Sequence, residues 1–96
     1  MKVLKKRPGG EWHLAEIENT LEALQAEVGG YIETITLCSD LCLIVNEEGR
    51  INAMPFNMNL AGVHLFGTIL VVGVSGDEFT DVPDGGLELF TRRVRT

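Results

Sequence analysis

The clearest indication of fold class in this chain is the stretch Thr68-Ile69-Leu70-Val71-Val72-Gly73-Val74. It is rich in β-branched side chains and lies between Gly67 and Gly76, which is typical of a strand. A second run, Leu41 to Val45, is continuously apolar, so we expect a central strand that is covered on both faces. Together these two runs predict a sheet with a buried middle.

Three further strands are predicted in the part of the chain that precedes these two runs. Met1 to Lys6 and Glu11 to Ile17 flank the turn-forming stretch Pro8-Gly9-Gly10, so we expect a hairpin at the start of the chain. Tyr31 to Leu37 alternates in part between apolar and polar residues, which is typical of a strand with one buried face. Ser39-Asp40 can then turn the chain into the apolar run.

One helix is predicted from about Thr20 to Val28. Asn19 can cap its start, with Glu22 three residues later as in a capping box, and Gly29 can adopt the left-handed conformation that ends it. Apolar residues at i, i+3 and i+7 share one face of this helix: Leu21, Leu24 and Val28. We therefore expect an amphipathic helix packed on the sheet.

The middle of the chain gives weaker patterns. Asn46 to Gly49 is expected to be a loop, followed by a strand from Arg50 to Met54 that stops at Pro55, which cannot donate a ladder hydrogen bond. Asn57 to His64 has no clear period, and it predicts a loop or a short helical turn.

The tail from 81 to 96 is open to two interpretations, a short helix or an irregular end. Leu87, Phe90 and Val94 fit one helical face, but Gly85-Gly86 weakens a helix start. The 96 residues as a whole suit one hydrophobic core. We therefore predict a single compact α+β domain over residues 1–96, with a mostly antiparallel sheet of about five or six strands and one main helix packed on it.

The cysteine and histidine residues do not predict a metal site. Cys38 and Cys42 have the spacing C-x-x-x-C, and His13 and His64 are far apart, whereas zinc sites usually group their ligands as C-x-x-C or H-x-x-x-H. We expect two reduced thiols that flank a turn or pack in the core as small hydrophobes. No metal and no cofactor is predicted.

No pattern in the chain indicates an enzyme. The adjacent acids Glu47-Glu48 and Asp77-Glu78 lie in predicted loops, where they are expected to be solvated, and a general acid needs burial to raise its pKa. Nucleophile elbows and phosphate-binding glycine loops are missing from the sequence.

Charge is segregated along the chain. The net charge is −6, thirteen of the fourteen acids lie between His13 and Thr91, and Arg50 is the one Lys or Arg in that interval. Such an acidic surface disfavours direct binding to nucleic acid. No apolar run is long enough for a membrane helix, so we expect a cytoplasmic protein. The basic ends are either solvated tails or, if the fold brings them together, one anion-binding patch.

A group of apolar residues near the middle has two possible roles. Leu65 and Phe66 are adjacent, and Met54, Phe56 and Met58 lie close by in the sequence. These side chains can fill the core or form an exposed contact patch, and we favour the core.

The chain resembles a small family of unknown function found in phages, prophages and conjugative elements. The similarity runs from Lys2 to about Val74, and the chain departs from the family pattern after Asp81. The residues that carry it form the patterns L-Q-x-x-V-G-G, N-E-E-G, P-x-N and G-T: Leu24, Gln25, Val28, Gly29, Gly30, Asn46 to Gly49, Pro55, Asn57, Gly67 and Thr68. None of these is a catalytic motif.

The resemblance implies a genetic setting, in which small acidic proteins often act by binding. We expect a non-catalytic binding protein that counteracts host defence, with an acidic face that blocks a host nuclease or another defence protein. The alternative is a sponge for a nucleotide-type immune signal, formed at a homo-oligomer interface. The candidate binding residues are Lys5, Lys6, Arg7, Asn46, Glu47, Glu48, Asn57, Arg92 and Arg93.

Overall fold

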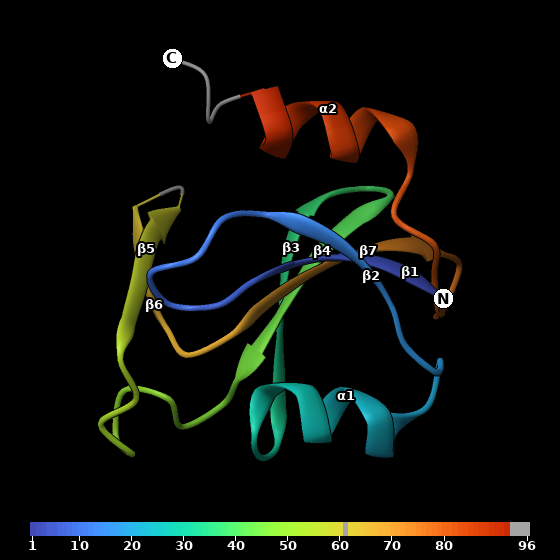
Figure 1. The fold of residues 1–96 in the computed structure, drawn as a ribbon. Helices are drawn as coiled ribbons and strands as arrows, with labels where there is room; N and C mark the ends of the chain where they lie inside the picture. Colours follow the sequence, from blue (N-terminus) through green and yellow to red (C-terminus); the bar gives the residue numbers. More distant parts are fainter. Residues whose placement is uncertain (61, 93–96) are drawn as a thin grey trace.

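An antiparallel sheet lies between two helices in the computed structural model, which describes residues 1–60 and 62–92 (Figure 1). The strands of the main sheet run in the order β2-β1-β7-β4-β3, and β8 also pairs with β7. Their bounds are β1 Lys2–Lys6, β2 His13–Glu16, β3 Ile32–Cys38, β4 Leu41–Asn46, β7 Ile69–Ser75 and β8 Glu78–Thr80. The predicted class, one α+β domain with a mostly antiparallel sheet, is confirmed.

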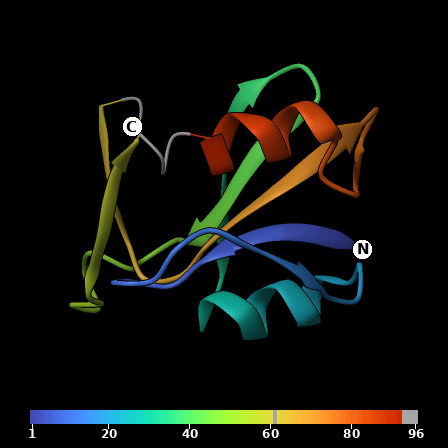
Figure 2. The same cartoon turned by 45° about the horizontal axis from the view of Figure 1, so that its top comes forward.

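The helices cover opposite faces of this sheet. Figure 2 shows α1 (Leu21–Val28) on one side and α2 (Asp84–Arg92) on the other. The main helix predicted from the sequence is α1, and α2 covers the other face of the sheet. The hairpin of β5 (Phe56–Leu60) and β6 (Val63–Phe66) forms a separate two-stranded sheet beside the main one.

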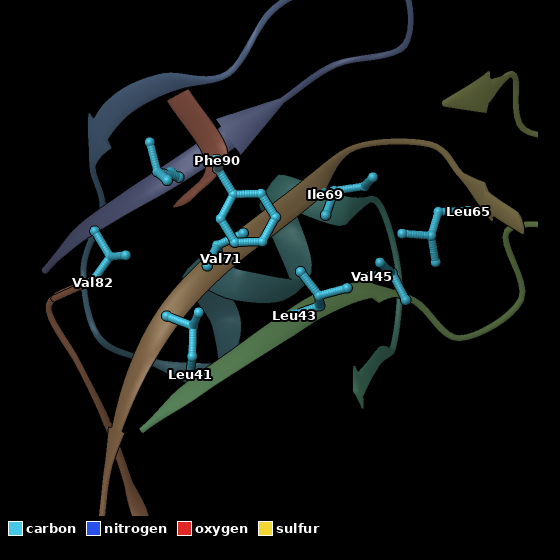
Figure 3. Close-up of a cluster of buried hydrophobic side chains, with 9 residues drawn as sticks. Leu41, Leu43, Val45, Leu65, Ile69, Val71, Val82 and Phe90 are labelled. Atoms are coloured by element: carbon cyan, nitrogen blue, oxygen red, sulfur yellow. The ribbon is translucent and has the colours of Figure 1, made fainter. Parts of the chain in front are cut away.

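Alternation along β4 and β7 builds two apolar clusters. Leu43 and Val71 point toward α2, whereas Ile44 and Leu70 point toward α1, and all four are at most 2 % exposed. Phe90 of α2 lies over the sheet in the same cluster as Leu43 and Val71 (Figure 3). The expectation that Leu41 to Val45 is covered on both faces is thus correct.

Helix α1 begins one residue later than predicted. The cap is Thr20, whose Oγ1 accepts a hydrogen bond from the Ala23 N–H at 3.1 Å, while the Asn19 side chain donates to the Phe79 carbonyl. Leu21 is exposed, so the buried face consists of Leu24 and Val28. The predicted end of the helix is correct, because Gly29 has φ +80° and its N–H donates a hydrogen bond to the Gln25 carbonyl.

Helix α2 resolves the open interpretation of the tail in favour of a helix as far as Arg92. Gly86 lies in its first turn and is buried, and a Cβ at this position would lie 2.8 Å from Leu41 Cδ1. The glycine that weakens helix propensity thus permits the helix to approach the sheet closely. The Phe90 ring packs on Trp12 with centroids 4.9 Å apart, which attaches α2 to the β1–β2 connection.

Two predictions for the middle of the chain are wrong. Residues Arg50 to Ala53 lie in consecutive turns and Met54 follows them, so the segment is not a strand; its amides bond to nearby carbonyls, such as Asn52 N–H to Glu48 O at 2.8 Å. The segment predicted as a loop or helical turn instead contributes residues 57–60 to β5 and residues 63–64 to β6, which pair as a hairpin. The third difference is β8, a short strand that includes Glu78, whereas the sequence predicts a loop at Asp77-Glu78.

Candidate functional site

Two buried polar side chains, Asn46 and Asn57, stand out in the part of the chain that the structure describes. Asn46 ends β4, and its Nδ2 donates to the Val28 carbonyl at 3.0 Å while its Oδ1 accepts from the Glu48 N–H at 2.7 Å. It therefore joins the end of α1 to the start of the loop after β4. This residue was a candidate for binding, but its polar atoms are used inside the protein.

Asn57 joins the hairpin to the main sheet. Its Nδ2 donates to the carbonyls of Lys6 and Gly67, at 2.9 and 2.8 Å, and its Oδ1 accepts from Lys6 Nζ at 2.7 Å. The side chain reaches inward because the pairing of β5 with β6 shifts register between Phe56 and Met58, which leaves Asn57 as the extra residue. Asn57 is thus a structural residue as well.

The loop from 47 to 54 is held in one shape by backbone hydrogen bonds. Its bonds include Glu47 N–H to Tyr31 O at 2.8 Å and Met54 N–H to Gly49 O at 2.9 Å. Ala53 has φ +56°, an unusual value for a residue with a Cβ. The loop is therefore ordered in advance of any contact with a partner.

This loop and the residue before β3 present the most exposed large apolar side chains among the described residues. Ile51 is 81 % exposed and Tyr31 is 70 % exposed. Three exposed carboxylates come from the same strand and loop, those of Glu33, Glu47 and Glu48, and Arg50 of the loop is exposed as well. We call the set Tyr31, Glu33, Glu47, Glu48 and Ile51 the loop-end surface. Its composition, exposed apolar side chains together with exposed acids, is typical of a surface that binds protein.

A groove of about 120 Å³ lies next to the loop-end surface, between β3 and the hairpin. Its lining includes Glu33 and Ile35 from β3 and Val63 and His64 from β6. Arg50 also lines the groove, with its guanidinium 5.7 Å from the centre of the Phe66 ring. The apolar side chains near the middle of the sequence are divided: Leu65 is buried, whereas Phe56 is half exposed.

The basic candidate residues do not gather on one face as far as the structure describes them. Lys5 forms an ion pair with Glu27 of α1, whereas Lys6 points to Asn57 and Arg7 is exposed in the β1–β2 turn. Lys5 is therefore on the sheet face opposite to α2. Arg92 ends α2; its side chain and the whole of Arg93 lie outside the described residues.

The thiols differ from each other in their surroundings. Cys42 is buried in β4, and desolvation by burial raises the pKa of its thiol, an effect reduced by a backbone hydrogen bond from Ile35. Cys38 is exposed where the chain turns from β3 into β4, so of the two thiols it flanks the turn while Cys42 packs in the core, and its Sγ donates to Asp40 Oδ1 at 3.3 Å. Within 1–60 and 62–92, no three potential metal ligands come together. Neither helix is long and apolar enough to cross a membrane.

The sequence was also compared with known proteins. A family model described as Domain of unknown function (DUF3846) matches residues 1–95. The chain belongs to this family. No curated protein and no solved structure gives a significant match.

Three residues of the loop-end surface, Tyr31, Glu33 and Ile51, are not among the candidates that the sequence indicates. Tyr31 was included in a strand, and Ile51 was placed in the strand predicted from Arg50 to Met54. A weak signal existed, because Ile51 is an isolated apolar residue among Asn46-Glu47-Glu48-Gly49-Arg50 and Asn52. An isolated apolar residue in a polar stretch favours a turn over a strand that must bury one face.

Proposed function

We propose that this protein is a non-catalytic binding protein that blocks a partner protein through its loop-end surface. The observation that carries the proposal is the pair of highly exposed anchors, Tyr31 and Ile51, on a backbone fixed by hydrogen bonds. Full burial of an isoleucine side chain contributes about 1.5–3 kcal/mol. Tyrosine is also among the residues most often found to dominate binding energy.

Pre-ordering of the loop supports the same proposal. Association is weakened whenever a flexible segment must be ordered on binding. Here the Asn46 side chain and the turns from 47 to 54 already hold Ile51 in place. The loop-end surface can therefore bind with little loss of conformational entropy.

The acidic rim favours a partner with a basic surface. Glu33, Glu47 and Glu48 are exposed on the same strand and loop as Tyr31 and Ile51, and complementary charge accelerates association and selects partners. The finer proposal is that the protein comes from a phage or mobile element and occupies the basic nucleic-acid groove of a host nuclease or another defence protein. It rests on the acidic surface and on the sequence resemblance described above.

The nucleotide sponge receives less support. The groove beside β3, at about 120 Å³, is smaller than the roughly 300–1,000 Å³ of most small-molecule sites. Two larger hollows, of about 290 and 540 Å³, are lined by acidic residues that repel a phosphate, Glu48 in the first and Glu78 and Asp81 in the second. Lys5 and Lys6, proposed to hold a phosphate, already bond to Glu27 and Asn57. A sponge would need other cations or a second copy of the chain.

The test is capture of a partner from bacterial host lysate, its identification, and measurement of Kd with the purified pair. Tyr31→Ala and Ile51→Ala are each expected to weaken binding by about tenfold or more, which corresponds to about 1.4 kcal/mol. Leu14→Ala is the control, because Leu14 is 49 % exposed on β2, at the other edge of the sheet.

Unchanged binding by the Tyr31→Ala, Ile51→Ala double variant would exclude the loop-end surface as the interface. The nucleotide-sponge alternative is tested separately, by measuring the Tm of the protein with each of a series of cyclic nucleotides. An increase in Tm with one nucleotide would favour the sponge over the protein inhibitor, because a ligand that binds the native state stabilises it.

A further inference from the structure

Strand β3 lies at the end of the main sheet, and β4 is its strand partner in the described part of the chain. The hydrogen bond from Glu47 N–H to Tyr31 O fixes the phase of this antiparallel ladder. Since hydrogen-bonded pairs alternate, the N–H and C=O groups of Glu33 and Ile35 face β4. Those of Ile32, Thr34 and Thr36 face outward.

This edge lacks the usual features that prevent strand pairing. Native edge strands are commonly blocked by Lys, Pro, short length or bulges. β3 is seven residues long with the sequence I-E-T-I-T-L-C, so Glu33 is its one charge and it contains neither Lys nor Pro. Its single irregularity lies between Thr36 and Cys38, at the end far from the loop-end surface.

The side chains near the edge define what kind of strand fits. Glu33 and Ile35 point to the α2 side of the sheet, where the groove beside β6 lies, with Glu47 at its end. Thr34 and Thr36, on the α1 side, are exposed. An added strand would therefore place alternate side chains in the groove, where the ammonium groups of lysines meet Glu33 and Glu47 and the aliphatic stems of the lysines cover Ile35.

We propose that the free edge of β3 accepts an extended, basic segment of the partner protein as an additional antiparallel or parallel strand. This inference rests on the proposed function and specifies how the partner is held: by backbone hydrogen bonds to Ile32, Thr34 and Thr36 and by charge pairing with Glu33 and Glu47. Charge complementarity selects this occupant over a second copy of the chain, whose own β3 carries Glu33 to the same edge.

The probe is a short synthetic peptide of alternating Lys and Val, with blocked ends. Binding is measured by NMR titration of the backbone amides, and the expected result is shifts centred on Ile32, Thr34 and Thr36. Two control peptides are used: alternating Glu and Val, and the Lys–Val peptide with alternate backbone nitrogens methylated, prepared in both phases. The acidic peptide should not bind, and the methylated peptide in the matching phase should bind about tenfold more weakly or worse.

A pair of variants at one position tests the protein side. Thr34→Pro removes an outward N–H and no bond to β4, so it should weaken the Lys–Val peptide by about tenfold or more. Thr34→Val alters the side chain and keeps the amide, so it should bind like the parent protein. The methylated peptides test the same bonds without altering the protein, so the experiment does not depend on the proline variant folding.

Equal binding of methylated and unmethylated peptides, or shifts away from β3, would overturn the proposal. So would a dimer that Thr34→Pro dissociates, because the edge would then be occupied by a second copy. If Ile51→Ala weakens the captured partner while Thr34→Pro does not, the strand-addition proposal fails and the proposed function stands. If the edge binds peptide but Tyr31→Ala and Ile51→Ala leave the partner's Kd unchanged, the proposed loop-end interface fails instead.

Discussion

The centre of the sheet and the segment from 47 to 67 are stabilised in different ways. β4 and β7 are covered on both faces by apolar side chains, and Ile44, Leu70 and Val71 have no exposed surface. The segment from 47 to 67 contributes Leu65 to the core but is attached through the side-chain amides of Asn46 and Asn57. A few directional hydrogen bonds thus position the loop-end surface, while many non-directional contacts hold the sheet.

This difference predicts that substitutions in the two regions will have different costs. Apolar contacts in the sheet affect global unfolding, whereas the asparagine bonds affect how one segment is held. Local opening of a segment has its own free energy, which can be far below that of global unfolding.

The largest loss of stability is expected in the sheet centre. Leu70→Ala removes a side chain that is 0 % exposed, and we expect a loss of about 2–5 kcal/mol in the free energy of unfolding, measured by urea denaturation. Val63→Ala on β6 is the control, because Val63 is 43 % exposed and should cost much less. Equal losses for the two variants would remove the distinction between the regions.

The next largest effect is expected for Asn57→Ala. It leaves the carbonyls of Lys6 and Gly67 without their side-chain donor, which costs about 1–3 kcal/mol. Hydrogen exchange should show faster opening of β5 and β6 and little change in β4 and β7. Asn59→Ala, at an exposed position of the same strand, should change neither. Uniform acceleration across the sheet would mean that the hairpin is not a separate unit.

Gly29→Val should lower stability by about 1 kcal/mol or more, because a residue with a Cβ is strained at φ +80°. The control is Ala26→Val, at an exposed position of α1, which carries the lower helix propensity of valine without the positive φ. A midpoint for Gly29→Val as high as that of Ala26→Val would contradict the left-handed helix stop.

The smallest effect on stability is expected at the loop-end surface itself. Ile51→Ala should change the free energy of unfolding by less than about 0.5 kcal/mol, because the side chain is 81 % exposed. Thermal and urea denaturation measure this directly. A loss above 1 kcal/mol would show that Ile51 packs against the protein and is not available to a partner.

Sequence patterns predicted the regions that depend on local periodicity. The β-branched run at 68–74 gave β7 within one residue, and the apolar run at Leu41 gave β4. β5 was not predicted, because the alternation of Phe56, Met58 and Leu60 with asparagines is short and does not continue to His64, and its buried residue is the polar Asn57. An inward polar residue held by bonds to Lys6 and Gly67 depends on contacts distant in sequence, which a local pattern does not contain.

The candidate site was predicted in part for the same reason. Glu47 and Glu48 are exposed as expected for adjacent acids in a loop. Asn46 and Asn57 were chosen as polar residues in loops, although burial and partners decide whether an amide faces solvent. The basic residues were grouped by their place in the sequence, whereas alternation along β1 sends Lys5 and Lys6 to opposite faces of the sheet.

The path of the chain between β4 and β7 has a consequence for how this architecture can vary. These two strands are antiparallel neighbours, and such strands can be joined by a turn of two residues. Here residues 47–68 lie between them, so the order of the main sheet does not require that segment. Residues 47–68 are thus an insertion between two neighbouring strands of the sheet. Proteins built in this way can change what they contact by replacing the insertion while the sheet and its helices stay the same.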